Sequence, residues 1–296
     1  MANYTFQYKP LDHTKQSIRL VHLSPELSDF EQWIQINITH TEIGARYVCL
    51  SYQWGSANIL EGNWILVNGS PFLVQQNLFD FLSLMRMTAV PEDAIFHPTM
   101  GYWIDALCIN QHDASEKHHQ VVQMGSIYQQ AEFVHVWLGA IDNAGLIRRL
   151  IDGPREPKDT PKWSEQVTLD MDFVHRHFFL NEYWTRSWVI QEFMLAHRIE
   201  VSLNRQRFAF SDLVRNIHFF SPHWIHTPFK EFALHHLGKF YFIGQPLIRL
   251  LTLFQKRKCS LVQDRIFSLT SLCDERDSVQ VDYRMHANKL AYNVLK

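Results

Sequence analysis

The chain has 296 residues, 46% hydrophobic and 14% aromatic, which is enough to bury a substantial core. Its 28 basic and 30 acidic residues nearly cancel, and no basic stripe stands out, which argues against nucleic acid as the main partner. Four cysteines without a CxxC disfavour a disulfide framework, and neither a signal-peptide core nor a membrane-length apolar run is present, so we expect a cytoplasmic protein with no membrane partner.

Strand-like segments dominate the first part of the chain. Runs rich in β-branched and aromatic residues predict strands at residues 18–23, 47–52, 102–109 and 133–139. Asn68-Gly69, between the two apolar runs of residues 64–74, predicts a tight hairpin.

Helix-like segments lie between these strands. Periodic apolar positions predict a helix over residues 77–87. Asp113 followed by Glu116 has the capping-box pattern of a helix start, and we expect that helix to end near residue 131. Strands that alternate with helices predict an α/β fold, with a parallel sheet flanked by helices.

The second part of the chain has a different pattern. The polar, proline-rich residues 152–166 predict a loop or boundary. Helical segments at about residues 168–180 and 185–197 and a strand at residues 199–203 follow. From residue 205 onward the patterns are mainly helical, and the cluster Lys256-Arg257-Lys258 predicts a set of charges at a helix end. We therefore predict an α/β domain over residues 1–204 and a helical extension packed on it over residues 205–296.

The segment NEYWTRSWVIQEFMLAH (181–197) carries the most informative pair of residues. Trp188 and Glu192 are four apart in a predicted helix, so their side chains share one face. A carboxylate beside a large aromatic side chain is a candidate catalytic group, because desolvation shifts its pKa and fixes its position. The alternative is a surface glutamate paired with a cation, which is the commoner arrangement on a helix.

Three blocks of the sequence together resemble one known family. They are YVCLSYQWG from Tyr47, YWIDALCINQHDASEKHHQVVQMGSIYQQAEFVHVWLG from Tyr102, and YWTRSWVIQEFMLA from Tyr183. In order and spacing they resemble the fungal heterokaryon-incompatibility (HET) domain over residues 18–202, and residues 259–295 look like the segment that often follows it. The resemblance implies an intracellular cell-death signalling protein that acts downstream of an upstream recognition protein.

The HET family is similar, more remotely, to Toll/interleukin-1 receptor (TIR) domains. That similarity implies a TIR/flavodoxin-like parallel sheet and cleavage of NAD⁺, with NAD⁺ as substrate and no bound cofactor. TIR enzymes carry their catalytic glutamate on a helix as Trp-Cys-x-x-Glu. Trp188-Val-Ile-Gln-Glu192 keeps the tryptophan and glutamate in register, with valine at the cysteine position. The resemblance implies that Glu192 is catalytic and that activity needs self-association into a homo-oligomer.

The remaining candidates are substrate-binding residues near predicted strand ends or near Glu192. Ligands of an open parallel sheet bind beyond the carboxyl ends of the strands, aromatic faces suit the nicotinamide and adenine rings, and a glycine admits close approach of backbone. The predicted substrate-binding residues are Ser51, Tyr52, Trp54, Gly55, Asp105, Asn110, Arg186 and Trp188.

Each of these candidates also has a structural interpretation. Trp54 and Trp188 are also compatible with core packing, and Asp105 with bracing a turn. Asn110, like Gln111, is compatible with holding the loop before the Asp113 helix, and Arg186 with an ion pair.

Other chemistries have less support in the sequence. No GxSxG, GxxxxGK[ST] or HExxH motif is present, and His118-His119 and His175-Arg-His177 lack zinc-site spacing, so we expect no metal. One rival hypothesis is a non-catalytic HET signalling and homotypic assembly module. Another is a nucleotide-binding or nucleic-acid-processing enzyme, against which the neutral charge balance argues.

Overall fold

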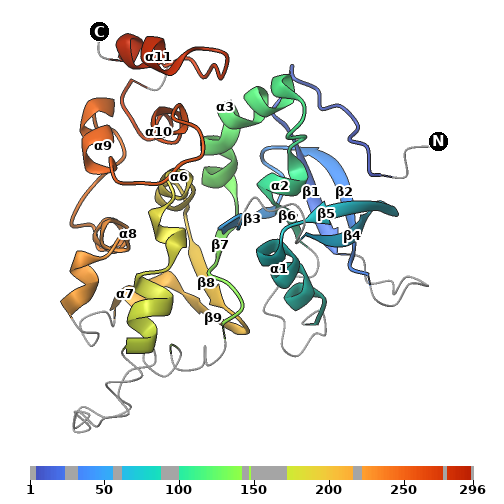
Figure 1. The fold of residues 1–296 in the computed structure, drawn as a ribbon, viewed down its shortest axis with the longest axis horizontal. Coiled ribbons are helices and arrows are strands. Elements are labelled where there is room, and N and C mark those ends of the chain that lie inside the picture. Colours follow the sequence, from blue (N-terminus) through green and yellow to red (C-terminus); the bar gives the residue numbers. More distant parts are fainter. Residues whose placement is uncertain are drawn as a thin grey trace, which may run out of the picture. The chain divides into compact units, whose positions relative to one another are not determined.

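The chain combines a sheet with flanking helices, and the predicted α/β class is confirmed (Figure 1). The computed structural model describes residues 5–23, 33–55, 62–87, 100–141, 147, 172–215, 222–275 and 279–294, so the predicted loop at 152–166 lies outside the described residues. Two units are distinguished: unit 1 comprises Met1–Ala140 and Ala196–Arg198, and unit 2 comprises Ile141–Leu195 and Ile199–Lys296. Whether an independently folding domain ends at residue 204 stays a prediction.

The described part of unit 1 contains a sheet in the order β5-β4-β2-β1-β6-β3-β7. Its strands are β1 (Ser17–Leu23), β2 (Gln35–Glu42), β3 (Tyr47–Tyr52), β4 (Asn63–Val67), β5 (Ser70–Val74), β6 (Gly101–Trp103) and β7 (Phe133–Trp137). The predictions for the first, second and fourth strand-like runs and for the hairpin are confirmed. β2 was missed because its alternation is weak and its outer face is polar.

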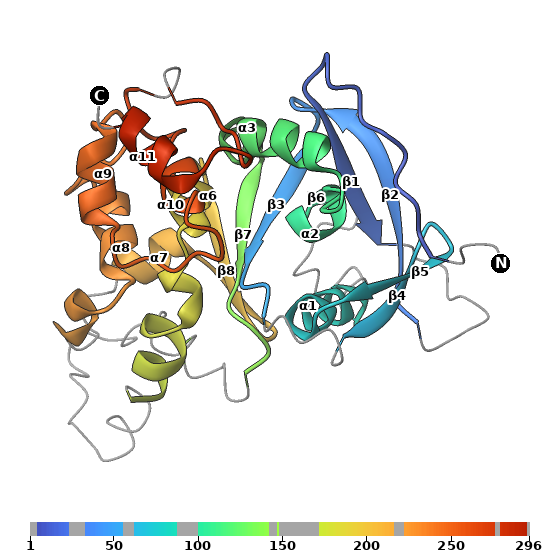
Figure 2. The same ribbon diagram turned by 45° about the horizontal axis from the view of Figure 1, so that its top comes forward.

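The centre of this sheet is parallel, as predicted. β3 pairs in parallel with β6 on one side and β7 on the other, so three successive parallel strands stand in the order 2-1-3. Helices α1 (Gln76–Met87) and α3 (Ala114–Gln130) lie in the connections. Tyr102 of β6 meets Phe81 of α1, while its neighbour Trp103 meets Tyr128 of α3. Since neighbouring strand residues point to opposite faces, the two helices cover opposite faces of the sheet (Figure 2).

A wholly parallel sheet was the wrong prediction for the rest of unit 1. β1 pairs antiparallel with both β2 and β6, and β4 pairs antiparallel with β5. In the hairpin the physical reason is the short turn at Asn68 and Gly69, whose φ angles of 49° and 78° reverse the chain within two residues.

The predicted strand at 102–109 is also corrected. Only Gly101–Trp103 is strand, and one helical turn, α2 (Asp105–Cys108), follows it. Asp105 Oδ1 accepts a hydrogen bond from Ala106 N at 2.7 Å, which stabilises the turn. Leu107 and Cys108 are buried in it, so an apolar run marked burial correctly but did not distinguish a strand from a buried turn.

Asp113 is the N-cap of α3, as predicted, because its Oδ1 accepts from Ser115 N at 2.9 Å and Glu116 N at 3.1 Å. The capping box is wrong for Glu116. Its carboxylate instead pairs with Arg19 of β1 inside the protein.

Unit 2 is built from short elements. They are η3 (His175–Phe179), η4 (Glu182–Thr185), α6 (Trp188–Met194), β8 (Ile199–Leu203), β9 (Gln206–Ala209), α7 (Phe210–Arg215), η6 (Pro222–His226), α8 (Lys230–His236), α9 (Leu247–Leu253), α10 (Asp264–Phe267) and α11 (Ala287–Val294). The strand at 199–203 is confirmed, and the helix predicted at 185–197 is shorter, since α6 covers Trp188–Met194. Of the helix predicted at 168–180, residues 172–179 are helical, and residues 168–171 lie outside the described residues. β9 was missed, and it forms an antiparallel hairpin with β8.

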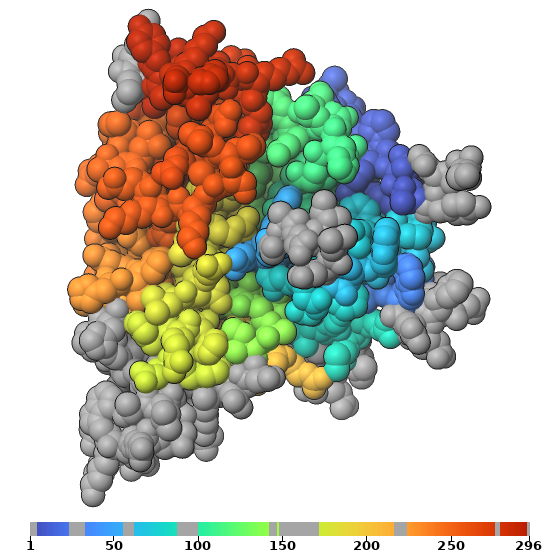
Figure 3. Space-filling model, in the orientation of Figure 1, coloured from blue at the N-terminus to red at the C-terminus, as the bar shows by residue number. Residues whose placement is uncertain are grey.

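An aromatic cluster forms the core of unit 2. Trp184, which is fully buried, meets Phe193, Phe229 and Phe232 at ring-centroid distances of 5.9, 5.0 and 5.1 Å. Phe193 comes from α6 and Phe232 from α8, so the predicted helical extension packs directly on the helix that carries Glu192. In the space-filling view the orange and red residues of the later helices form a continuous surface (Figure 3).

Candidate functional site

In unit 1, two candidates meet where β3 and β6 end. Trp54, half-buried after β3, donates its indole Nε1–H to Asp105 Oδ2 at 2.8 Å. The other oxygen of Asp105 accepts from Ala106 N within α2, and the Asp105 carbonyl oxygen accepts from Gln111 Nε2 at 3.1 Å. Asp105 therefore has the contacts of a turn brace, and the residue is half-exposed.

The other strand-end candidates differ in exposure. Ser51 and Tyr52 are only 1% and 3% exposed, so both lie in the interior of unit 1. Gly55 is exposed and has a φ of 87°, which a side chain would strain, and an added Cβ would lie 3.3 Å from Gln75 Oε1. A substrate role for these three residues stays a prediction.

Asn77, at the start of α1, was not predicted as part of this region. Its Nδ2 donates to Gln53 O at 2.6 Å, and its Oδ1 accepts from Trp137 Nε1 at 2.8 Å. It thereby ties the ends of β3 and β7 together. An asparagine opening a helix was the signal available in the sequence, but its partners lie 24 and 60 residues away.

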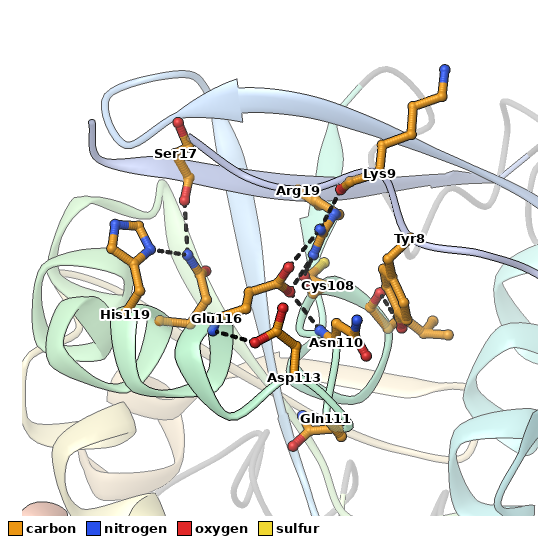
Figure 4. Close-up of polar contacts among 12 residues, drawn as sticks. Tyr8, Lys9, Ser17, Arg19, Cys108, Asn110, Gln111, Asp113, Glu116 and His119 are labelled. Carbon is orange, nitrogen blue, oxygen red and sulfur yellow. Dashed lines mark hydrogen bonds and ion pairs between the residues drawn. The ribbon is translucent and has the colours of Figure 1, made fainter. Parts of the chain in front are cut away.

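Asn110 belongs to a buried ionic brace (Figure 4). Arg19 Nη1 and Nη2 lie 2.6 and 2.8 Å from the two carboxylate oxygens of Glu116, and the Arg19 and Glu116 side chains are 1% and 3% exposed. Glu116 Oε1 also accepts from Asn110 N at 2.6 Å, and Arg19 donates to Cys108 O and Lys9 O at 2.8 and 2.6 Å.

This arrangement gives the block around Asn110 a structural role. Asn110 Oδ1 accepts from His112 N at 3.2 Å, so the side chain as well as the backbone holds the loop before α3. Burial raises the pKa of the Cys108 thiol to about 12, which keeps it protonated and makes it a poor nucleophile.

In unit 2, Trp188 and Glu192 lie on α6 with the predicted spacing of four. Glu192 is 2% exposed, so the surface-glutamate interpretation is wrong, whereas Trp188 is half-buried. A carboxylate this deeply buried is costly unless its surroundings compensate it, and such groups concentrate at functional sites.

The start of α6 is fixed by the segment that contains Lys258. Ser187 donates from both its N and its Oγ to Lys258 O, each at 2.9 Å, and Lys258 N donates to Thr185 O at 2.7 Å. Arg186 forms a backbone bridge with Lys258, and its half-buried side chain keeps a substrate role as a prediction.

Gln191, beside Glu192, was missed by the sequence reasoning. It is 1% exposed, and within the described part of the chain neither its Nε2 nor its Oε1 has a hydrogen-bond partner. A buried amide without partners costs about 1–3 kcal/mol, and its presence needs an explanation such as function. Nothing in the spacing of the sequence distinguished it from a solvated helix residue.

Neither a metal-binding cluster nor a membrane-spanning helix occurs among the described residues. No group of three or more His, Cys, Asp or Glu side chains there is arranged to hold a metal ion. Of the helices in the described ranges, none combines the length and apolarity needed to cross a membrane.

Comparison with known proteins identifies the family. Residues 47–192 match the family model described as heterokaryon incompatibility protein (HET), and the matched range includes β3, the ionic brace and α6. The match assigns residues 47–192 of this chain to the HET family.

The chain is similar to heterokaryon incompatibility protein 6, OR allele, of Neurospora crassa. The two are 33% identical over 106 residues, which cover 34% of this chain and only 15% of that relative. No solved structure matches the chain.

Proposed function

We propose that this HET domain signals by hydrolysing NAD⁺ at the nicotinamide–ribose bond, with Glu192 as the catalytic carboxylate. The observation that carries the proposal is the 2% exposure of Glu192 on α6, four residues after Trp188 and at the end of the matched range. The similarity of the HET family to TIR enzymes, which place a glutamate at this point of a Trp-x-x-x-Glu helix, supplies the reaction.

The chemistry needs few groups. Nicotinamide leaves NAD⁺ as a neutral molecule, so no acid is required to protonate it. Positive charge grows on the ribose in the transition state, and one fixed carboxylate can stabilise that charge. Ordinary glycosidases use two carboxylates because their leaving oxygen must also be protonated. One decisive glutamate is therefore sufficient for this reaction.

Binding is assigned to two of the remaining candidates. Within unit 2, Trp188 is half-buried, so it retains part of an aromatic face for the nicotinamide ring. Arg186, two residues before Trp188, offers a cation to the pyrophosphate. Self-association, triggered by an upstream partner, is proposed to complete the active state.

The test is nicotinamide release from NAD⁺ by the purified chain, at dilute and at crowded protein concentration. We expect Glu192→Gln to lower kcat by about 100-fold or more, the usual loss for a group that stabilises developing charge. Glu182→Gln is the matched control, since Glu182 is an exposed glutamate ten positions earlier whose ion pair with Lys258 lies at the surface. It should keep wild-type turnover.

The outcomes separate the hypotheses. Full turnover in a folded Glu192→Gln variant would remove Glu192 from the mechanism. Turnover that rises more than in proportion to protein concentration would support activation by assembly. An oligomer that signals but leaves NAD⁺ intact would instead favour the non-catalytic assembly module.

A further inference from the structure

A small cavity of about 80 Å³ lies within unit 2, beside the start of α6. Its polar wall is formed by Ser187, Gln255, Arg257, Arg265 and Ser268, and its other lining side chains are apolar. A water needs roughly 10–15 Å³ of such space, so this cavity has room for a group of about five heavy atoms. No carboxylate lines it, and its polar wall includes two guanidinium groups, which donate hydrogen bonds and cannot accept them.

Arg257 belongs to the predicted helix-end charge cluster, and it is buried, with 7% of its surface exposed. Its Nη2 donates to Pro228 O at 3.0 Å and to Glu231 Oε2 at 2.9 Å. Its guanidinium carbon lies 5.0 Å from the centroid of Phe232. Its Nη1 is buried and has no hydrogen-bond partner within the described residues.

Ser268 presents a second unused donor at the same cavity. The residue is fully buried, and its Oγ has no partner among the residues that the structure describes. Arg265 and Gln255 are exposed, and Arg265 Nη1 donates to Gln255 O at 2.8 Å. The cavity is thus lined by two exposed polar residues, a buried arginine and a buried serine. Nη1 of the arginine and Oγ of the serine have no acceptor among the described residues.

Arg257 Nη1 and Ser268 Oγ each need a hydrogen-bond acceptor, and an anion with several oxygens would supply both. Leaving N–H and O–H donors buried without acceptors is costly, and more so for a charged group. Two guanidinium groups with a hydroxyl suit a tetrahedral oxyanion, because arginine presents paired N–H donors that match phosphate geometry. The ion pair between Glu231 and Arg257 involves Nη2 of the arginine and leaves Nη1 without an acceptor in the described structure.

We propose that this cavity is a binding site for a phosphate group, supplied either by inorganic phosphate or by a nucleotide. Ser187 immediately precedes α6, and its anchor Lys258 immediately follows Arg257. Phosphate on Arg257 therefore steadies the first turn of the helix that carries Glu192. The consequence for NAD⁺ cleavage rests on the proposed function, whereas phosphate binding does not.

The experiment is a titration of the purified chain with inorganic phosphate. Calorimetry measures binding, and hydrogen exchange measures the protection of the peptide that contains residues 186–194. Sodium chloride at equal ionic strength is the control. We expect saturable heat and slower exchange with phosphate only. Arg265→Gln should weaken binding about tenfold, the value of one charge-assisted hydrogen bond. Ser268→Ala should weaken it about threefold.

Arg249→Gln is the matched control variant, because Arg249 is an exposed arginine of α9 outside the cavity lining. It should bind phosphate as the wild type does. The Glu192→Gln protein should also bind normally, which separates failure of this proposal from failure of the NAD⁺ proposal.

ADP distinguishes the two sources of phosphate. Tighter binding of ADP than of phosphate, lost in Arg265→Gln, would identify a nucleotide as the ligand. Equal or weaker binding of ADP would identify free phosphate. An equal response to chloride, or unchanged phosphate affinity in both Arg265→Gln and Ser268→Ala, would overturn the site.

Discussion

Two parts of the matched family range, the block around Asn110 in unit 1 and helix α6 in unit 2, bury polar groups with different surroundings. In unit 1 the residues around Asn110 and Glu116 have multiple internal partners and hold a loop and a helix start. In unit 2 the buried residues next to Trp188 include an amide, Gln191, whose polar atoms have no partner in the described structure, and the carboxylate of Glu192. Satisfied groups stabilise a fold, whereas buried polar groups that cost stability concentrate at functional sites. We therefore expect a structural role for the first set and propose a functional one for the second.

The largest expected effect comes from breaking the ionic brace of unit 1. Arg19→Met leaves the Glu116 carboxylate buried without its cation, so the free energy of unfolding should fall by about 3–5 kcal/mol. Urea unfolding measures the loss, and hydrogen exchange should locate it in peptides of unit 1. The double variant Arg19→Met, Glu116→Leu should recover much of the stability. A single variant as stable as wild type would contradict the structural assignment.

A pair of glutamine variants sharpens the comparison, because they should change stability in opposite directions. Gln191→Leu removes a buried amide without partners, so it should raise the free energy of unfolding by about 1–3 kcal/mol while lowering NAD⁺ cleavage. Gln120→Leu should destabilise, because it removes the hydrogen bond that the fully buried Gln120 donates from Nε2 to Ser17 O at 2.8 Å, although Gln120 Oε1 has no partner among the described residues.

Urea unfolding of both variants, with nicotinamide release beside it, provides the measurement. Destabilisation by Gln191→Leu would show that the amide has partners that matter for folding. The assignment of function to the α6 residues would then lose one of its two supports.

The sequence predicted the local patterns in this molecule better than the contacts between distant segments. The runs at 47–52 and 133–139, the Asn68-Gly69 turn and the Asp113 cap depend on neighbours in the chain, and all were confirmed. The partner of Glu116 is 97 residues away, so a local capping rule was applied where a distant arginine determined the outcome.

The same limit applies to the candidate site. The spacing of Trp188 and Glu192 on one helix followed from the sequence, but the burial of Glu192 came from tertiary packing. The contact between Trp54 and Asp105 joins residues 51 positions apart and could not be read from spacing. The burial of Gln191 and Arg257 was missed because polar side chains are usually solvated, and tertiary packing in unit 2 buries both.

The smallest expected effect is a pH dependence of unit 1. His119 Nε2 donates to Lys15 O at 3.1 Å, and its Nδ1 accepts from Gln120 and Gln123 at 3.2 and 3.0 Å, which is the pattern of a neutral imidazole. Burial, followed by the charge of His13 stacked on it at 4.5 Å, lowers the pKa of His119 below its usual 6.5.

Because the folded state resists protonation of His119, the unfolded state binds more protons just below pH 6.5. The stability that neutral His119 provides is complete above that pH and is lost as pH falls through the lowered folded pKa. Urea unfolding between pH 7.5 and 5 should therefore show less loss of stability on acidification for His119→Gln than for wild type. His118→Gln, at an exposed neighbouring position, should follow the wild-type profile. Parallel profiles for His119→Gln and wild type would place the acid-sensitive groups elsewhere, and the brace around β1 and α3 would then be stable to protonation.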